Sequence, residues 1–177
     1  MRSPAPASPL HELRVIKALS LPGLIRLVTE IDDHGPISHQ YGSLQGAFGD
    51  LTPGQLRHAI NTARDLGLVH ADEQAPDRYR LTESGEDLAE VYDTAARWAR
   101  AHQYPSDSSD FVTRVQHTLQ LPAPDPASEA DSDHSGVGTD RPQPPNALAD
   151  WLETHPHVLN QAASRSSRSA DETGLAA

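Results

Sequence analysis

The residues best suited to recognition chemistry lie in the stretch "LTPGQLRHAINTARDLGLV", from Leu51 to Val69. In the major groove of DNA, Arg pairs with guanine and Asn or Gln with adenine, through two hydrogen bonds each. The residues that this stretch offers for such contacts are Thr52, Gln55, Arg57, His58, Asn61, Thr62 and Arg64. A merely solvated helix face is the alternative. That alternative is disfavoured because the face contains no Lys or Glu, and its only carboxylate, Asp65, stands at the far end.

Local signals in this stretch predict a helix over residues 53–66. Thr52 is a suitable N-cap, Pro53 suits the first helical position, and Gln55 completes a T-x-x-Q capping box. Gly67 marks the end, where glycine commonly follows a helix. The apolar stripe that must face the core consists of Leu56, Ala59, Ile60 and Ala63. The polar residues therefore leave the other side of the helix.

A two-stranded hairpin is predicted directly after this helix, over residues 69–82. The segment "LVHADEQAPDRYRLT" alternates about a central "QAPD" turn. Arg78 and Arg80 would point to the same face and could contact the DNA backbone. Cross-strand pairing with Asp72 or Glu73 is the alternative, and the sequence leaves the two open.

The wider pattern predicts an α+β fold that is mostly helical. Apolar residues recur at helical spacing between Leu21 and Ile31, from Leu88 into the segment that ends at Pro105, and from Phe111 to Leu119. A further short helix is expected in the segment "ISHQYGSLQGAFGD", residues 37–50. The predicted organisation is a disordered N-terminus 1–9, a domain 10–121, a disordered linker 122–145, a short amphipathic helix 146–160 and a disordered tail 161–177, the disordered parts being rich in Pro, Ala, Ser and Asp.

Charge and composition limit the classes of function. Of the net charge of −11 over 177 residues, residues 1–121 carry −5 (11 Lys and Arg against 16 Asp and Glu) and residues 122–177 carry −6 (3 against 9). Strong non-specific binding to DNA is therefore not expected, because it requires clustered cations. The chain has no Cys, no apolar run of the roughly 20 residues that span a membrane, and no secretory signal at its start. These features predict a cytoplasmic protein without disulfides.

The histidines do not form a recognisable metal site or catalytic site. His155 and His157 flank Pro156, and His34 and His39 lie near acidic residues, but neither pair has the ligand number or the H-E-x-x-H spacing of a zinc site. The sequence also lacks a G-x-S-x-G elbow, a P-loop and a G-x-G-x-x-G loop. We expect no catalysis, no cofactor and no metal.

The segments "GPISHQYGSLQGAFGDLTPGQLRHAINTARDLGLV" and "DRYRLTESGEDL" together resemble the HxlR type of winged helix-turn-helix transcriptional regulator, which is related to the MarR regulators. The matching positions are Gly35-Pro36, Leu51-Thr52-Pro53, Gly67-Leu68-Val69, Tyr79, Leu81, Thr82 and Gly85. The resemblance covers residues 10–120. It implies a winged helix-turn-helix domain in which the helix 53–66 enters the major groove and the wing 69–82 contacts the backbone.

The resemblance also implies a homodimer that forms through the terminal helices. The residues expected at this interface are Leu13, Tyr92, Trp98, Phe111 and Val115. Packing of the terminal helices within one chain is the alternative. The predicted function is a sequence-specific, double-stranded DNA-binding regulator. The alternative is a winged-helix module for protein interaction or dimerisation with little or no DNA affinity. The acidic domain favours that alternative, as does the helix 146–160 with Trp151, a possible docking element for a protein partner.

Overall fold

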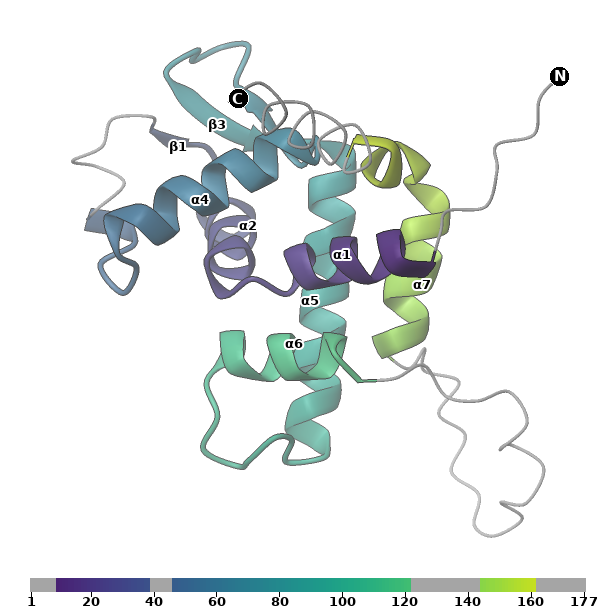
Figure 1. The fold of residues 1–177 in the computed structure, drawn as a ribbon. Coiled ribbons are helices and arrows are strands. Elements are labelled where there is room, and N and C mark those ends of the chain that lie inside the picture. Colours follow the sequence, from purple (N-terminus) through teal and green to yellow (C-terminus); the bar gives the residue numbers. More distant parts are fainter. Residues whose placement is uncertain (1–8, 39–45, 122–143, 162–177) are drawn as a thin grey trace, which may run out of the picture.

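A small antiparallel sheet lies at one end of a helical body in the computed structural model of the protein, which describes residues 9–38, 46–121 and 144–161 (Figure 1). The predicted α+β, mostly helical class is confirmed. The elements are α1 Pro9–Leu19, α2 Pro22–His34, β1 Ile37–Ser38, α4 Pro53–Asp65, β2 Val69–Ala71, β3 Arg78–Leu81, α5 Glu83–Ala101, α6 Phe111–Leu119 and α7 Pro144–Thr154. Residues 156–161, which follow α7 in the sequence, form a further helical segment.

Side-chain caps fix the starts of three helices. Thr52 and Gln55 form the predicted capping box of α4, and Pro53 occupies its first turn. The Thr82 hydroxyl accepts a hydrogen bond from the Gly85 N–H at the start of α5. Asp110 caps α6, where hydrogen bonds from the Thr113 N–H and hydroxyl lower the pKa of Asp110. Each of these signals is local, which is why sequence alone can place such helix starts.

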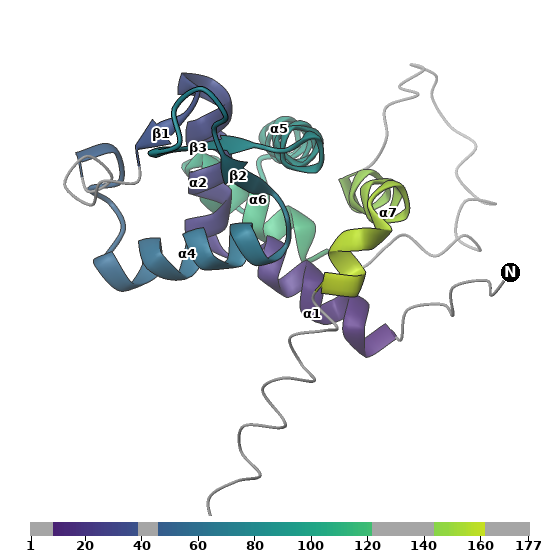
Figure 2. The ribbon, with the colours of Figure 1, turned by 90° about the horizontal axis from the view of Figure 1, so that it is seen from above.

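The sheet has the order β1-β3-β2 and is antiparallel throughout. The predicted hairpin is present as β2 and β3, with Val69 opposite Leu81 and His70 opposite Arg80. The strand β1 was not predicted from the sequence, because two residues carry no readable alternation. It joins the free edge of β3, where Ile37 lies opposite Tyr79. Figure 2 shows α4 below this sheet and α5 beyond the end of β3, from which α5 continues.

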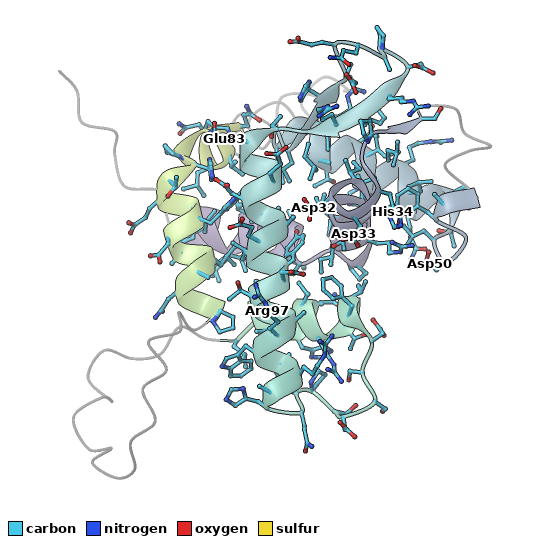
Figure 3. All side chains as sticks on the ribbon, turned by 180° about the vertical axis from the view of Figure 1, so that it is seen from behind. Asp32, Asp33, His34, Asp50, Glu83 and Arg97 are labelled. Atoms are coloured by element: carbon cyan, nitrogen blue, oxygen red, sulfur yellow. The ribbon has the colours of Figure 1, made fainter. Side chains whose placement is uncertain are left out.

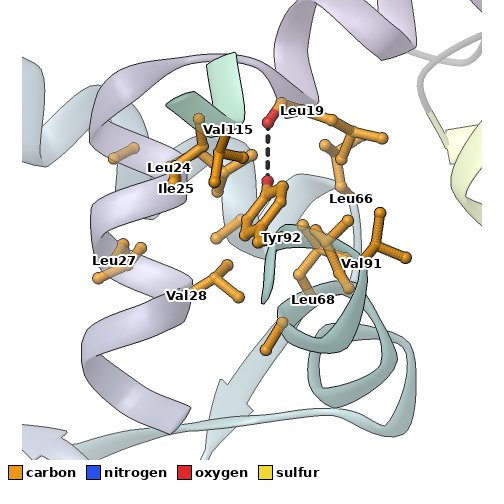
Figure 4. Packing of buried hydrophobic residues seen from close by; sticks show 14 of the residues in the cluster. Leu19, Leu24, Ile25, Leu27, Val28, Leu66, Leu68, Val91, Tyr92 and Val115 are labelled. Carbon is orange, nitrogen blue, oxygen red and sulfur yellow. Dashed lines mark hydrogen bonds between the residues drawn. The ribbon is translucent and has the colours of Figure 1, made fainter. Parts of the chain in front are cut away.

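The core lies where α2, α5 and α6 meet, and it contains residues that we had expected at a dimer interface. Tyr92 is fully buried, its ring packs among the side chains of α2, and its hydroxyl donates a hydrogen bond of 2.7 Å to the Leu19 carbonyl (Figure 4). Burial raises the pKa of Tyr92. Val115 of α6 is equally buried. The expectation that Tyr92 and Val115 form a dimer interface is therefore wrong: their apolar surface is covered within one chain.

The helix α7 is part of the same core, which corrects the predicted domain boundary at residue 121. The side chains of Leu148, Trp151 and Leu152 are buried against the core cluster, and the Trp151 Nε1–H donates to the Ser84 carbonyl at 3.1 Å. His155 Nε2 lies 2.9 Å from the Asp87 carboxylate of α5. The apolar side of this helix is already covered, so it is not a free docking element for a protein partner.

Several boundaries of the predicted organisation also differ. The helix α7 begins at Pro144, two residues before the predicted start and inside the segment expected to be disordered. Pro9 and Gln161 are likewise helical. Of the short helix expected over 37–50, the described part contains two helical residues, 46 and 47, and the buried Phe48. The rest of the predicted N-terminus, linker and tail lies outside the described residues.

Candidate nucleic-acid interface

The outer side of α4 presents a row of polar side chains to solvent. Arg57, His58, Asn61 and Arg64 are exposed, and Gln55 is exposed at the N-terminal end. Arg57, Asn61 and Arg64 are spaced by four and three residues, so they leave the same side of the helix. Leu56, Ala59 and Ala63 are buried on the other side, as the sequence predicted. The helix therefore joins an anchored apolar face to an exposed face of hydrogen-bond donors and acceptors.

Thr62 is the exception among the predicted contact residues. Its side chain is only 5% exposed, so the expectation that it points outward is wrong. Thr62 lies three residues after Ala59 and four before Leu66, and both of these are buried. The buried stripe of α4 is therefore wider than the hydrophobic residues alone indicate, because a threonine methyl group can pack in it.

The two residues of the capping box hold each other. The Gln55 N–H donates to the Thr52 hydroxyl at 3.3 Å, and the Thr52 N–H donates to the Gln55 Oε1 at 2.8 Å. The Thr52 hydroxyl and the Gln55 side-chain oxygen are thus both engaged in hydrogen bonds at the start of α4. The Gln55 amide NH₂ is left as a donor toward solvent.

Three arginines on this side of the molecule are not neutralised by neighbours. Within the described residues, Arg57, Arg64 and Arg78 take part in no ion pair. Arg guanidinium groups that are free in this way can form bidentate hydrogen bonds with a base edge or a phosphate. The helix α4 also contains no acidic residue before Asp65.

The two arginines of the wing differ in whether they pair across the strands. Arg80 Nη2 lies 3.4 Å from the Asp72 carboxylate, so the cross-strand pair forms at this position. A hydrogen bond from the Gln74 N–H, together with the charge of Arg80, lowers the pKa of Asp72. Arg78 remains exposed on the same face of β3. The wing therefore offers Arg78 as its available cation, next to the exposed acidic residues Glu73 and Asp77 of the turn.

Sequence reasoning missed His70 on the outer face of the sheet. The antiparallel register places His70 directly opposite Arg80, and both side chains are exposed. Its ring Nδ1 lies 2.7 Å from the Ala71 carbonyl oxygen. The predicted hairpin would have revealed this position, because residues opposite each other in a register point to the same face.

Acidic residues gather on a different side of the domain, between α2 and α5. Asp32 and Asp33 end α2 there (Figure 3), close to three carboxylates of α5. Partial burial and the neighbouring charges of Asp33, Asp93, Glu86 and Glu90 raise the pKa of Asp32. The acidic excess of residues 1–121 is thus unevenly distributed, and the exposed row of α4 is free of it.

The remaining candidate interface residues lie in two places. Leu13 of α1 is 62% exposed, and its neighbour Leu10 is 71% exposed; within the described chain these are the exposed large hydrophobic side chains. Trp98 and Phe111 are half-buried. Trp98 stacks on His102 with ring centroids 4.2 Å apart, and Phe111 packs against the core. Of the five predicted interface residues, Leu13 has the most accessible surface.

The described residues contain no group of three or more His, Asp or Glu side chains arranged to hold a metal ion. His155, which was considered as a ligand from the sequence, contacts Asp87 instead, and its ring centroid lies 5.1 Å from that of Trp151. Within the same residues, no helix combines the length and the apolar character needed to cross a membrane.

No protein-family model matches this chain. Likewise, no curated protein and no solved structure matches it. The geometry of α4 and of the wing therefore carries the functional argument, and the resemblance to HxlR-type regulators remains a prediction from the motifs.

Proposed function

We propose that this protein is a sequence-specific DNA-binding transcriptional regulator of the winged helix-turn-helix type. The observation that carries the proposal is the exposed row Arg57, Asn61 and Arg64 on α4, in which both arginines are free of ion pairs among the described residues. Arg and Asn are the side chains that read guanine and adenine in the major groove. In this proposal α4 lies in that groove and Arg78 of the wing contacts a phosphate.

The order of the elements supports this proposal. The turn at residues 46–51 leads directly into α4, and α4 is followed at once by the hairpin of β2 and β3. The recognition helix of such motifs lies on the surface, while the preceding helix supports it from behind. The separation of the acidic residues between α2 and α5 from the face of α4 further favours contact of this face with a polyanion.

We infer that the regulator acts as a homodimer, since many such proteins read two half-sites with a two-fold axis. Leu10 and Leu13 of α1 support this inference because they expose apolar surface that the described residues do not cover. Isolated exposed leucines are common. Here, however, two of them lie three positions apart on one side of the same helix.

DNA recognition should depend on Asn61 and Arg78 in different ways. We expect Asn61→Ala to cost about 1–3 kcal/mol at one base pair and to relax the preference there, because a paired amide is lost. Arg78→Ala should weaken binding to all sequences about equally and lower the salt slope by about one, because a phosphate contact is lost. Selection from random duplexes, followed by titration at several salt concentrations, measures both effects.

The matched control for this experiment is Arg97→Ala on α5, which removes a charge away from α4 (Figure 3). It should leave both the selected sequence and the salt slope unchanged. If the parent protein enriches no sequence at low salt, the proposed function is wrong. If Arg97→Ala weakened binding and lowered the salt slope as much as Arg78→Ala does, only net charge would matter, and the proposed phosphate contact of Arg78 would be wrong.

The dimer should depend on α1. Leu13→Asp should shift the protein toward the monomer at micromolar concentration, since a buried charge without a partner is costly at an interface. Analytical ultracentrifugation of the parent and the variant measures this shift, and Glu12→Gln, an exposed change on the same helix, is the control. A parent protein that is monomeric at these concentrations, or a Leu13→Asp variant that remains dimeric, would contradict the inferred interface.

The second candidate function is a protein-interaction module of the same fold with little DNA affinity. Two observations favour it: the wing turn exposes the acidic residues Glu73 and Asp77, and Arg80 is already paired with Asp72. The helix that contains Trp151 does not support this second candidate, because that helix packs within the chain. The DNA selection described above separates the two functions.

A further inference from the structure

One side chain of α2 contacts several residues of the turn before α4. Arg26 of α2 lies with its guanidinium carbon 5.5 Å from the centroid of the Phe48 ring, and Phe48 is fully buried. Arg26 Nη2 donates to the Ala47 carbonyl at 3.4 Å, and Arg26 Nε lies 3.6 Å from the Asp50 carboxylate. Three successive parts of the turn, at residues 47, 48 and 50, therefore contact the same guanidinium group.

The other side of this guanidinium is also fixed. Arg26 Nη1 forms an ion pair with Glu30 one turn further along α2, and Glu30 in turn lies 3.2 Å from His34 Nδ1. Held by Glu30, Arg26 has little freedom to leave the turn. A planar group with five donors can make these contacts at once, whereas a lysine ammonium could satisfy only some of them.

Near Arg26, α2 also touches the body of α4. A Cβ atom placed on Gly23 would lie 3.3 Å from the Ala59 Cβ and 3.4 Å from the Gln55 carbonyl oxygen. The two helices thus approach each other closely at Gly23, one turn before Arg26. The buried side chains of Leu56, Ala59 and Ala63 hold the body of α4 in the core. The link from Arg26 to the turn adds a point of attachment at the N-terminal end of α4.

We propose that Arg26 is a positioning residue that fixes the direction of α4 through the turn at residues 47–51. Its consequence for DNA rests on the proposed function: α4 reads bases only if Arg57 and Asn61 enter the groove at a fixed angle. Arg26 itself is held by two carboxylates and serves α4 rather than a phosphate. Removing it should leave the global fold intact, because partly exposed ion pairs contribute little to stability.

Two readouts on the full chain test this proposal, and the first requires no DNA. The amides of Leu51 and Leu56 donate hydrogen bonds to the Phe48 and Thr52 carbonyls and report on the turn and the start of α4. In Arg26→Gln, their hydrogen exchange should become about tenfold faster, because local opening becomes easier when the three contacts of Arg26 with the turn are lost. The melting temperature should change little. Arg26→Lys should give an intermediate rate, and Arg97→Gln, which removes the same charge from α5, should give the parent rate.

The second readout is the ratio of specific to non-specific DNA affinity for the sequence that the parent selects. Arg26→Gln should lower this ratio by about tenfold while non-specific affinity and the salt slope stay at the parent values. Unchanged exchange at Leu51 and Leu56 would overturn the proposal. An equal loss on all DNA with a lower salt slope would also overturn it, because Arg26 would then be a phosphate contact. If the parent selects no DNA, the proposed function fails, and hydrogen exchange still decides the role of Arg26.

Discussion

Replacing Gly85 with alanine should remove a large part of the folding stability. Gly85 lies in the first turn of α5, and a Cβ atom there would stand 2.2 Å from the Leu68 carbonyl oxygen and 3.2 Å from its carbon. The atoms in the way are backbone, so no side-chain rotation can relieve the clash. That carbonyl also accepts a hydrogen bond from the Thr82 N–H, which shifting the strand would break. We expect a loss of about 3 kcal/mol or more in the free energy of unfolding, measured in urea.

The control for this prediction is a second glycine in the first turn of a helix. Gly54 of α4 has no atom within 4 Å of the place where a Cβ would stand. Gly54→Ala should leave the free energy of unfolding unchanged or raise it by up to about 1 kcal/mol, through helix propensity. If Gly85→Ala were tolerated as well as Gly54→Ala, the close contact between α5 and the segment that contains Leu68 would be wrong.

Truncating Trp151 should have an effect of similar size. Its indole is 4% exposed, packs in the core cluster and donates to the Ser84 carbonyl. Trp151→Ala should lower the free energy of unfolding by about 3–5 kcal/mol, because the lost burial leaves a cavity against α5. Chemical denaturation followed by circular dichroism measures this loss in the full chain.

Trp151→Phe separates the hydrogen bond from the packing. It keeps most of the apolar contact and should cost about 1–3 kcal/mol, since the Ser84 carbonyl loses a buried partner. A loss below about 1 kcal/mol for Trp151→Ala would mean that α7 is a dispensable addition to the fold, as the predicted boundary at residue 121 implied.

The features that sequence predicted well are those with local causes. The start of α4 follows from a cap, a proline and a reciprocal Gln, all within four residues. The hairpin of β2 and β3 follows from alternation about one turn. On α4, hydrophobic spacing separated the buried side from the exposed side everywhere except at Thr62, whose type gives no sign of its burial.

The features that sequence missed depend on contacts between distant residues. Tyr92 and Val115 belong to the apolar stripes of α5 and α6, and such a stripe looks the same whether it faces its own chain or a second one. The sequence predicted that Trp151 is free to dock a protein partner, because its hydrogen-bond partner, Ser84, is far away in the sequence. The sequence does not reveal the role of Arg26, since its contacts with Ala47 and Asp50 depend on how the turn folds back onto α2.

The docking of α7 has a consequence for the time course of folding. The hydrogen bond between Trp151 and Ser84 closes a loop of 67 residues, and the contact between His155 and Asp87 closes one of 68. Contacts of such long range form late, because chain entropy opposes them until the rest is in place. During synthesis, the surface of α5 that receives Trp151 must therefore stay uncovered until the ribosome has made α7. The newly made domain passes through a stage in which that apolar surface is open to chaperones and to other chains.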